Sequence, residues 1–508
     1  MAEITNTDQD GSERLPRGAW PAFAALSVFT YFFALWLPFF GPDEPRYAQV
    51  AREMFERGDW VTPTLGGFTW FEKPALLYWL EIASFHLFGI SEFAARVGPT
   101  LFGLGTIAAL WLFGRDHERR SSETMNFANW LALIAASTLG LIVFSRGASF
   151  DIVITFPITA ALVSFFLYDS STDRAQPPKY FALILFYFFC GLALLAKGLI
   201  GIVFPFAIVG AFYVLDRRMP SGRFIISMMW GTLVACSVAG IWYLPMYLEH
   251  GWKFIDEFFI QHHFQRFTSN KYQHPQPFYF FLWVLPLMTL PWMPFFLAAI
   301  WRSVREILWG PVDPNDDRES YSRLSRFSIA WIGVPLIFFS FSGSKLPGYI
   351  LPAVPGAIIF TALTIFRLVR KSRRWAVLIY SAACSIFVIC IVLLLTVVPR
   401  FADGDSAKGL FEAADQHGHA GLRVFSLHTI SHSAEFYAAK RLLRDPDGKQ
   451  KKLYSPSEVV AEMRRANVNK ALVLVPPEHL RQLTESGALT SDLIRDNGEW
   501  AIVAVSIE

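Results

Sequence analysis

The chain has 508 residues, of which 53% are hydrophobic and only 17% are charged. A soluble domain carries about 25% charged residues, so this composition excludes an ordinary soluble protein and predicts a polytopic α-helical membrane protein. The formal net charge of +3 is too small to indicate a nucleic-acid partner.

A helix needs roughly 20 predominantly apolar residues to cross a membrane. About eleven segments of the chain meet this requirement, and weaker stretches raise the upper limit to about thirteen. The expected spans are 20–40, 94–114, 125–144, 150–168, 180–196, 198–215, 224–245, 277–300, 326–342, 348–366 and 375–397.

Basic residues in the short loops between these spans predict their orientation. Arg217-Arg218 and the cluster at 370–374 mark the inner side of the membrane, because Lys and Arg are retained there. The N-terminus is therefore expected inside, whereas the loop 41–92 and the tail 401–508 are expected outside. The polar first 18 residues lack the features of a cleaved signal peptide, so the first span is expected to stay as an anchor. All four cysteines fall within the spans, so no disulfide framework is expected outside.

The loop 41–92 is expected to hold two short helices that lie in the interface plane. Pro45 suits a helix start, an apolar periodicity follows it, and Gly58 ends that helix. The second helix is expected from Pro74 to Gly89, and residues 62–67 between the two are expected to form a loop.

The tail changes character and predicts a small α/β domain, since strand and helix patterns alternate in it. No catalytic spacing appears there. The expected strands are 422–427, 470–475 and 500–505, and the expected helices are 434–443 and 457–465.

Asp43 and Glu44 are the first candidates for chemistry. Asp43 alone could be the N-cap of the helix that begins at Pro45. Two adjacent carboxylates beside a membrane also suit a general base or a divalent metal site, and one cap needs only one side chain. Both interpretations of Asp43 remain open from the residues alone.

Glu72 and Lys73 could form a solvated surface pair of little energetic value. However, Trp70, Phe71 and Pro74 surround them, and Lys73 is expected at a helix start, where phosphate binds well. This position favours a role for Lys73 in binding phosphate.

Further ionisable residues lie at the expected outer ends of the spans. Asp151 is a functional candidate on that ground, although Arg146 could simply pair with it. Lys197 and Lys345 occupy tight outward turns, where snorkelling to the interface is the alternative role. His263 and Arg266 lie three apart, so they share a face if their segment is helical.

Four motifs carry a resemblance to a known family. They are Gly41-Pro42-Asp43-Glu44-Pro45-Arg46-Tyr47-Ala48, Phe71-Glu72-Lys73-Pro74, Leu195-Ala196-Lys197-Gly198 and the run from Ser344 to Pro352. In this order they resemble the lipid A aminoarabinose transferase family of the glycosyltransferase C superfamily, which is related to the protein O-mannosyltransferases. The resemblance covers roughly residues 20–400, and the tail shows no matching motif.

The resemblance implies a polyprenyl-phosphate-linked sugar donor and a periplasmic active site in the inner membrane of a bacterium. Asp43 would be the loop carboxylate of the superfamily, and Lys73, Arg266 and Tyr349 would face the donor phosphate. We expect Glu44 and Asp151 to act with Asp43, and Lys197 and Lys345 to act with the other cations. Supporting roles are expected for Arg46, Tyr47, Glu72 and His263, and a divalent metal ion at Asp43 and Glu72 is an open expectation.

The resulting hypothesis is an inverting glycosyltransferase that acts as a monomer on lipid A or a related periplasmic acceptor, with 1–400 as its transmembrane domain and 401–508 as its α/β domain. One alternative is a related transferase that uses another sugar, or that modifies another glycan, a lipid core or a protein hydroxyl. A second alternative is a transporter or lipid flippase. Transporters place charged sites near the membrane midplane, whereas the acids here lie in a long loop, so the enzyme is favoured.

Overall fold

The computed structural model describes residues 15–16, 18–119, 125–172, 179–265, 276–309 and 318–507, with the side chains of 262–265, 306–309 and 318–322 left out. The chain divides into two compact units. The first unit comprises residues 1–33, 72–77 and 99–391, and the second comprises 34–71, 78–98 and 392–508. These units differ from the predicted domains 1–400 and 401–508, because the structure groups most of the loop 41–92 with the tail.

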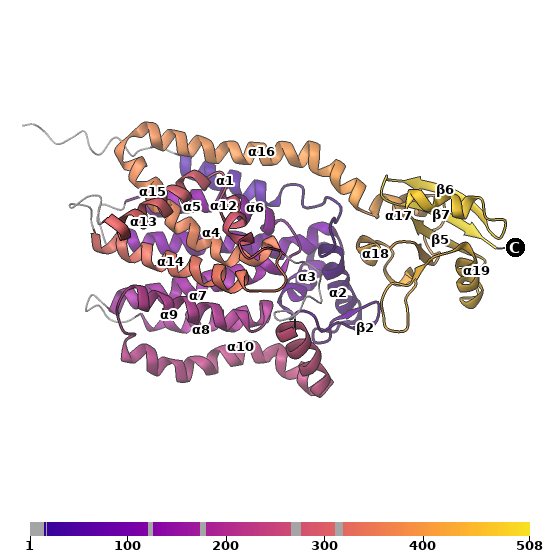
Figure 1. Cartoon of the computed structure of the whole chain (residues 1–508), viewed down its shortest axis with the longest axis horizontal. Helices are drawn as coiled ribbons and strands as arrows, with labels where there is room; N and C mark the ends of the chain where they lie inside the picture. Colours follow the sequence, from indigo (N-terminus) through magenta and orange to yellow (C-terminus); the bar gives the residue numbers. More distant parts are fainter. Residues whose placement is uncertain are drawn as a thin grey trace, which may run out of the picture. The chain divides into compact units, whose positions relative to one another are not determined.

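The first unit is helical. Within it α7 packs against α8, α8 against α9 and α10, and α14 against α9 and α15 (Figure 1). The unit boundaries fall inside α3 (Leu76–Phe88), α4 (Glu92–Glu118) and α16 (Arg373–Asp405). The other elements of the first unit are α1 (Ala19–Phe32), α5 (Phe127–Ala136), α6 (Leu139–Ser145), α7 (Phe150–Thr172), α8 (Tyr180–Lys197), α9 (Ile200–Leu215), α10 (Gly222–Ile255), the π-helix η2 (Asp256–Gln265), α12 (Phe280–Met288), α13 (Met293–Trp309), α14 (Arg318–Ser340), the 3-10 helix η3 (Pro347–Ala353) and α15 (Val354–Lys371).

Among the described residues, six helices are long and apolar enough to cross a membrane, and the bent pair α5 and α6 is a seventh candidate. Three further apolar helices, α1, α3 and α9, are shorter than the length required of these candidates. The prediction of a polytopic helical membrane protein is therefore confirmed, while the count of about eleven spans stays a prediction.

The first expected span, 20–40, is shorter than predicted, because α1 ends at Phe32. The last carbonyls of a helix have no partner within it, and here Arg146 supplies one. Its guanidinium donates to the backbone oxygens of Thr30, Tyr31 and Phe33. A lone arginine in a distant segment thus fixes the end of this helix.

Two other expected spans are divided. Residues 125–144 form α5 and α6, which meet at a bend of 58°. The hydroxyls of Ser137 and Thr138 donate back to carbonyls of the preceding turn, a contact that bends helices. Residues 277–300 form α12 and α13, and Pro291 lies between them. The helix is interrupted there because proline disfavours a helical conformation of the residue before it.

The second unit contains a mixed five-stranded sheet in the order β4-β3-β5-β7-β6. Strand β3 pairs in parallel with β4 and β5, whereas β7 pairs antiparallel with β5 and β6. The elements of the tail are α17 (Lys408–Gln416), β3 (Val424–Leu427), α18 (His432–Tyr437), the 3-10 helix η4 (Ala439–Arg441), β4 (Lys452–Leu453), α19 (Pro456–Arg465), β5 (Lys470–Val475), the 3-10 helix η5 (Pro477–His479), α20 (Leu480–Thr484), β6 (Thr490–Asp496) and β7 (Ala501–Ser506).

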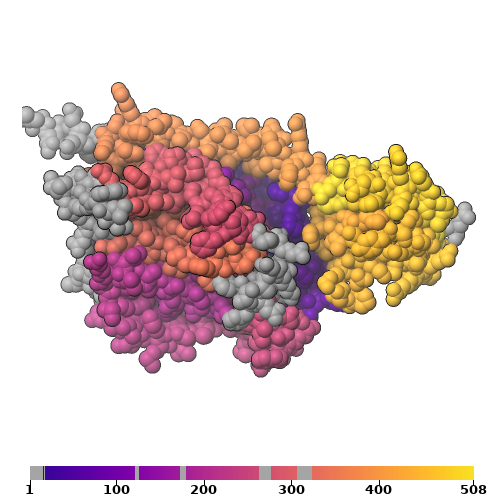
Figure 2. All heavy atoms as spheres, viewed as in Figure 1, coloured from indigo at the N-terminus to yellow at the C-terminus, as the bar shows by residue number. Residues whose placement is uncertain are grey.

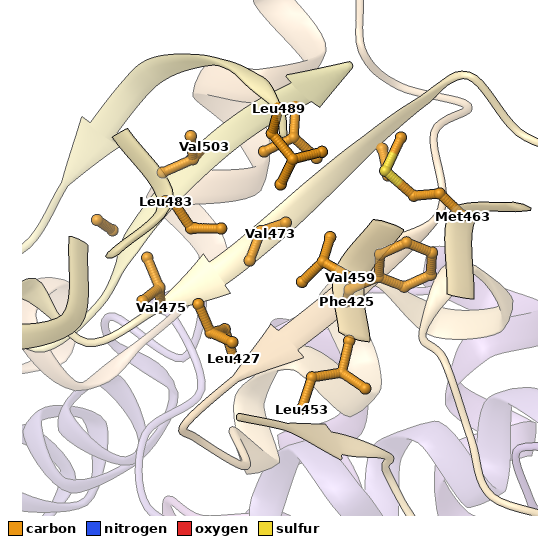
Figure 3. Packing of buried hydrophobic residues seen from close by; sticks show 13 residues of the cluster. Phe425, Leu427, Leu453, Val459, Met463, Val473, Val475, Leu483, Leu489 and Val503 are labelled. Carbon is orange, nitrogen blue, oxygen red and sulfur yellow. The ribbon is translucent and has the colours of Figure 1, made fainter. Parts of the chain in front are cut away.

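Each face of the sheet carries a cluster of buried apolar residues, although the edge strand β6 is largely exposed. Neighbouring residues of a strand point to opposite faces, so Phe425 and Leu427 pack in one cluster and Val424 in another. The first cluster brings Leu427, Val473 and Val475 together with Val459 of α19 (Figure 3). In the space-filling view the yellow C-terminal residues form one continuous mass (Figure 2). The predicted α/β domain is therefore confirmed.

The expected tail elements agree with the structure apart from one helix. The helix predicted at 434–443 is wrong in extent: α18 ends at Tyr437, and a 3-10 turn follows. Ala439 has a positive φ of 49°, which a continuing α-helix does not allow. Strands β4 and β6 and helices α17 and α20 were not predicted.

The part of the loop in the second unit contains α2 (Glu44–Arg57) and a small hairpin. Helix α2 ends at Gly58, which has a positive φ of 65°, as predicted. Residues 62–67, predicted as a loop, instead contain β1 (Thr64–Leu65), which pairs with β2 (Phe68–Thr69). Gly66 and Gly67 join these strands with φ of 64° and 83°, the backbone that a type I′ hairpin turn requires.

Candidate functional site

The second unit contains the acidic start of α2. Asp43 occupies the N-cap position, yet its side chain accepts no capping hydrogen bond. Its Oδ1 lies 2.5 Å from Nη2 of Arg46, one helical turn later. The Arg46 guanidinium also lies 5.6 Å from the ring centroids of Tyr47 and Trp70. The Asp43 side chain is 48% exposed, so the structure favours an accessible carboxylate over a capping residue.

Glu44 has a different environment from Asp43. Its two carboxylate oxygens accept hydrogen bonds from Nε and Nη2 of Arg96, at 3.0 and 2.7 Å. Arg96 is only 2% exposed, and it also donates to the backbone oxygens of Leu35, Leu37 and Pro38. A bidentate buried pair of this kind holds its members in place. Glu44 thus positions the start of α2, and Arg96 is a residue that the sequence reasoning missed.

A second missed residue is Glu81 of α3. It is fully buried, and neither of its oxygens has a hydrogen-bond partner among the described residues. Burial, followed by the nearby charge of Glu44, raises the pKa of Glu81 well above its usual range. Burial without a compensating partner disfavours the charged form of a carboxyl.

Helix α18 of the tail packs on α2 within the second unit. Nη1 of Arg52 donates to the carbonyl of Phe436 at 3.4 Å, and Lys440 pairs with Glu56 at 2.8 Å. Desolvation, followed by the charge of Arg46, lowers the pKa of His432, against the opposite effect of Asp43. The tail therefore contributes an imidazole to the surroundings of Asp43, although no pattern in the tail predicted it.

The first unit brings together three of the predicted residues. Lys197, the last residue of α8, forms an ion pair with Oδ1 of Asp151, and its Nζ lies 5.0 Å from the ring centroid of Tyr349. The Lys197 and Asp151 side chains are 17% and 18% exposed. Asp151 thus pairs with Lys197, while Arg146 binds backbone oxygens of α1. The snorkelling alternative for Lys197 is not supported.

Gly348 makes this arrangement possible. A Cβ added at Gly348 would overlap Oδ2 of Asp151 and lie 2.8 Å from Phe144. The backbone before Tyr349 therefore passes directly over the carboxylate. Position 348 requires glycine because the side chain of Asp151 lies too close to the backbone for a Cβ, and not because the backbone there has a positive φ.

Lys345 has an environment of its own. It is only 6% exposed, and its Nζ donates to the backbone oxygens of Ser342 at 2.6 Å and Gln276 at 3.2 Å. Both acceptors are neutral carbonyl oxygens of the backbone.

Glu72 and Lys73 pair with each other at 3.2 Å in the first unit, and their side chains are 10% and 12% exposed. The expectation that this pair is not freely solvated is confirmed. Helix α3 begins at Leu76, so Lys73 precedes the helix start by three residues instead of occupying it.

Two predicted residues cannot be placed in detail. His263 lies in η2, where its side chain is not described, and Arg266 lies outside the described residues. Their roles stay predictions.

The expected metal ion also stays a prediction. Each of its proposed ligands has a cation beside it, Arg46 for Asp43 and Lys73 for Glu72. Among the described residues, no group of three or more His, Cys, Asp or Glu side chains is arranged to hold a metal.

Comparisons with known proteins agree with the motifs. Residues 34–258 match the family of dolichyl-phosphate-mannose-protein mannosyltransferases. The undecaprenyl phosphate-alpha-4-amino-4-deoxy-L-arabinose arabinosyl transferase of Serratia proteamaculans is 32% identical over 68% of this chain, and that of Yersinia enterocolitica is 31% identical over 70%. These matches span 59% and 61% of the relatives' own lengths.

The fold also has a solved counterpart. The crystal structure of ArnT from Cupriavidus metallidurans, bound to undecaprenyl phosphate, matches with a TM-score of 0.79 at 20% identity, over 96% of this chain and 98% of that one. Together with the apolar helices, these relationships indicate a multi-pass bacterial membrane protein. The resemblance inferred from the four motifs is therefore confirmed: this chain is related to the undecaprenyl phosphate-aminoarabinose transferases and has a glycosyltransferase C fold.

Proposed function

We propose that this protein is an inverting glycosyltransferase that moves 4-amino-4-deoxy-L-arabinose from undecaprenyl phosphate to lipid A or a related periplasmic acceptor. The observation that carries the proposal is the arrangement of Lys197 between Asp151 and the ring of Tyr349. This arrangement holds the Lys197 ammonium, a partly buried cation, in a fixed position. The chain is related to transferases that use a sugar donor linked to undecaprenyl phosphate, and the phosphate of such a donor needs a cation.

The reaction follows from the charges. An oxygen of the acceptor attacks C1 of the sugar, the bond from C1 to the phosphate oxygen breaks, and undecaprenyl phosphate leaves as an anion. A phosphate leaving group needs cations more than a proton donor, because its charge increases as the bond breaks. We assign this compensation to Lys197 and Lys73, each held in an ion pair with a neighbouring carboxylate.

The role of Asp43 depends on the acceptor. A hydroxyl acceptor loses a proton as it attacks, and the exposed Asp43 carboxylate can take that proton as a general base. A phosphate acceptor is already an anion, and Asp43 then orients it through Arg46. We propose that the loop with Asp43 lies on the periplasmic side of the membrane, as the basic residues in the opposite loops predict.

The test uses purified protein in lipid vesicles with the synthetic donor and lipid A, and mass spectrometry detects the added sugar. Lys197→Met should abolish transfer, and Asp43→Asn should reduce it strongly for a hydroxyl acceptor. Lys470→Met, which removes an exposed lysine at the start of β5, is the matched control and should act like wild type. Transfer at the wild-type rate by folded Lys197→Met would contradict the assignment, and no transfer by wild type would contradict the donor or the acceptor.

A further inference from the structure

The second unit contains a groove to which the proposed function has assigned no role so far. The groove has a volume of about 860 Å³, which is within the range of sites for small organic ligands. Helix α2 and the hairpin β1–β2 line one side, and the α/β part of the tail lines the other. All of its lining residues belong to this one unit.

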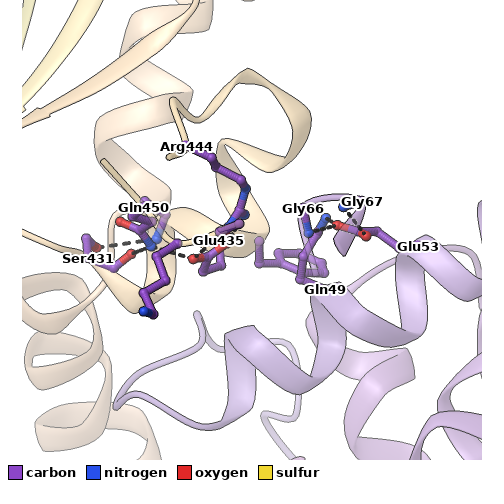
Figure 4. Close-up of polar contacts among 12 residues, drawn as sticks. Gln49, Glu53, Gly66, Gly67, Ser431, Glu435, Arg444 and Gln450 are labelled. Atoms are coloured by element: carbon purple, nitrogen blue, oxygen red, sulfur yellow. Dashed lines mark hydrogen bonds and ion pairs between the residues drawn. The ribbon is translucent and has the colours of Figure 1, made fainter. Parts of the chain in front are cut away.

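The walls of the groove are held together by specific contacts (Figure 4). Glu53 accepts hydrogen bonds from the backbone nitrogens of Gly66 and Gly67, at 2.7 and 3.0 Å, and so fixes the hairpin turn. Arg444 pairs with Glu435 and donates to the carbonyl of Gly448 at 2.9 Å. A Cβ at Gly66 would overlap the Arg444 side chain, so the hairpin turn lies directly against the tail. The groove is therefore preformed.

Cationic side chains outnumber carboxylates in the lining of the groove, and one of these cations, Arg444, is paired with Glu435, which does not line it. Six cationic side chains line it against four carboxylates, which gives a net charge of +2. The cations are Arg57, Arg423, Lys440, Arg444, Lys451 and Arg465, and the carboxylates are Glu53, Glu56, Asp445 and Glu462.

Three of these cations are available to a ligand. The side chains of Lys440 and Arg465 are 77% and 73% exposed. Arg423 is exposed and forms no ion pair with a carboxylate of the described residues. Arg465 shares Glu462 with Lys451, at 3.7 and 2.7 Å, so Glu462 stays paired when Arg465 turns toward a ligand. Ligand binding here therefore requires no buried ion pair to break.

We infer that this groove binds the phosphate of a phosphorylated saccharide. Arginine matches phosphate geometry with two parallel hydrogen bonds, and lysine adds a point charge. The groove is also larger than a phosphate ion needs, and its uncharged lining includes Phe68, whose aromatic ring can stack on a sugar ring, beside Gly66, Gly67, Leu442, Leu443, Pro446 and Ala466. The inference deepens the proposed function, on which it rests for the idea that an anionic, lipid-linked saccharide is the acceptor.

The binding test uses the full-length protein without donor. Ligand-observed NMR compares N-acetylglucosamine 1-phosphate with N-acetylglucosamine, so the two probes differ only in the phosphate. Wild type should bind the phosphorylated probe alone, and the double variant Arg423→Gln/Arg465→Gln should bind it roughly threefold to tenfold more weakly. Arg481→Gln removes an exposed arginine of α20 that does not line the groove, so this matched control should bind like wild type.

Three results would overturn the inference. The first two are equal affinity of wild type for the two probes and an unchanged affinity of the double variant for the phosphorylated probe. The third is displacement of the phosphorylated probe by inorganic phosphate at equal concentration, which would indicate a site for free phosphate. Because the measurement contains no donor, it is independent of whether the protein transfers a sugar. In the vesicle assay the double variant should raise the KM for a phosphorylated acceptor and leave kcat unchanged.

Discussion

Replacement of Arg96 by methionine tests how the start of α2 is held. The substitution keeps much of the side-chain volume but removes the charge and every hydrogen-bond donor. Glu44, whose side chain is 13% exposed, would then be a buried carboxylate without a cation. The backbone oxygens of Leu35, Leu37 and Pro38 would lose their donor at the same time.

Removal of one partner of a buried ion pair costs about 3–5 kcal/mol. For a unit of this size that loss corresponds to a fall in the melting temperature of roughly 6–20 °C. Arg115→Met is the control on the same helix: Arg115 is 49% exposed, so solvent screens its pair with Glu118, and Glu118 (9% exposed) keeps the hydrogen bond from the backbone nitrogen of Ala128. Such exposed pairs contribute about 0.2–1 kcal/mol, so the control should melt close to wild type.

The assay is thermal unfolding of the detergent-solubilised protein, followed by tryptophan fluorescence. The double variant Glu44→Met/Arg96→Met should recover part of the loss, because it leaves no unpaired buried charge. If Arg96→Met melts as close to wild type as Arg115→Met does, the pair of Glu44 and Arg96 does not position α2.

Three further outcomes are expected. Gly348→Ala should cost about 1–3 kcal/mol of stability and most of the transfer activity, because the new Cβ would overlap Asp151. Melting and transfer at the wild-type level would show that the backbone at position 348 can move aside. Glu81→Gln should stabilise the protein relative to wild type, and the difference should grow as the pH rises above 4.5. The reason is that Glu81 ionises in the unfolded chain but resists ionisation in the folded one, so wild type loses about 1.4 kcal/mol of stability per pH unit up to the folded pKa. Melting curves from pH 5 to 8 measure this difference, and a difference that does not change with pH would contradict the prediction. Neutral His432 contributes its full stability to the folded protein above pH 6.5, the ordinary pKa of histidine. Because its folded pKa is lowered, this stability is lost as the pH falls from 6.5 toward the folded pKa. His432→Gln should therefore lose less melting temperature than wild type below pH 6.5, and an unchanged dependence of melting temperature on pH would refute this.

The features that local signals encode could be predicted from the sequence. Proline and glycine mark the ends of α2 within a residue or two, because their backbone preferences act at their own positions. Strands β3, β5 and β7 were predicted because each is a run of buried apolar residues. Strand β4 has only two residues, too few to form a pattern, and it was missed.

The site was only partly predictable for a related reason. The motifs identified Asp43, Lys197 and Tyr349, and Asp151 was identified by its position at the end of an expected span, but the partner of each side chain was not predicted. Lys197 meets Asp151 across 46 positions of sequence, and Arg96 meets Glu44 across 52. Arg96 did carry one usable signal, since an arginine within an apolar span is a candidate for function by default.

The composition of the second unit has a consequence for the order in which the protein folds. The backbone nitrogen of Gly41 donates to Asp405, 364 positions later, and that of Phe39 donates to the hydroxyl of Tyr437, 398 positions later. Contacts over such separations form slowly, and the chain is made from its N-terminus at about 5–20 residues per second. The segment that carries Asp43 therefore waits for the last quarter of the chain before its own packing is complete. We therefore expect that a molecule whose first helices are already in the membrane lacks the final packing of residues 39–41 until the tail has been made.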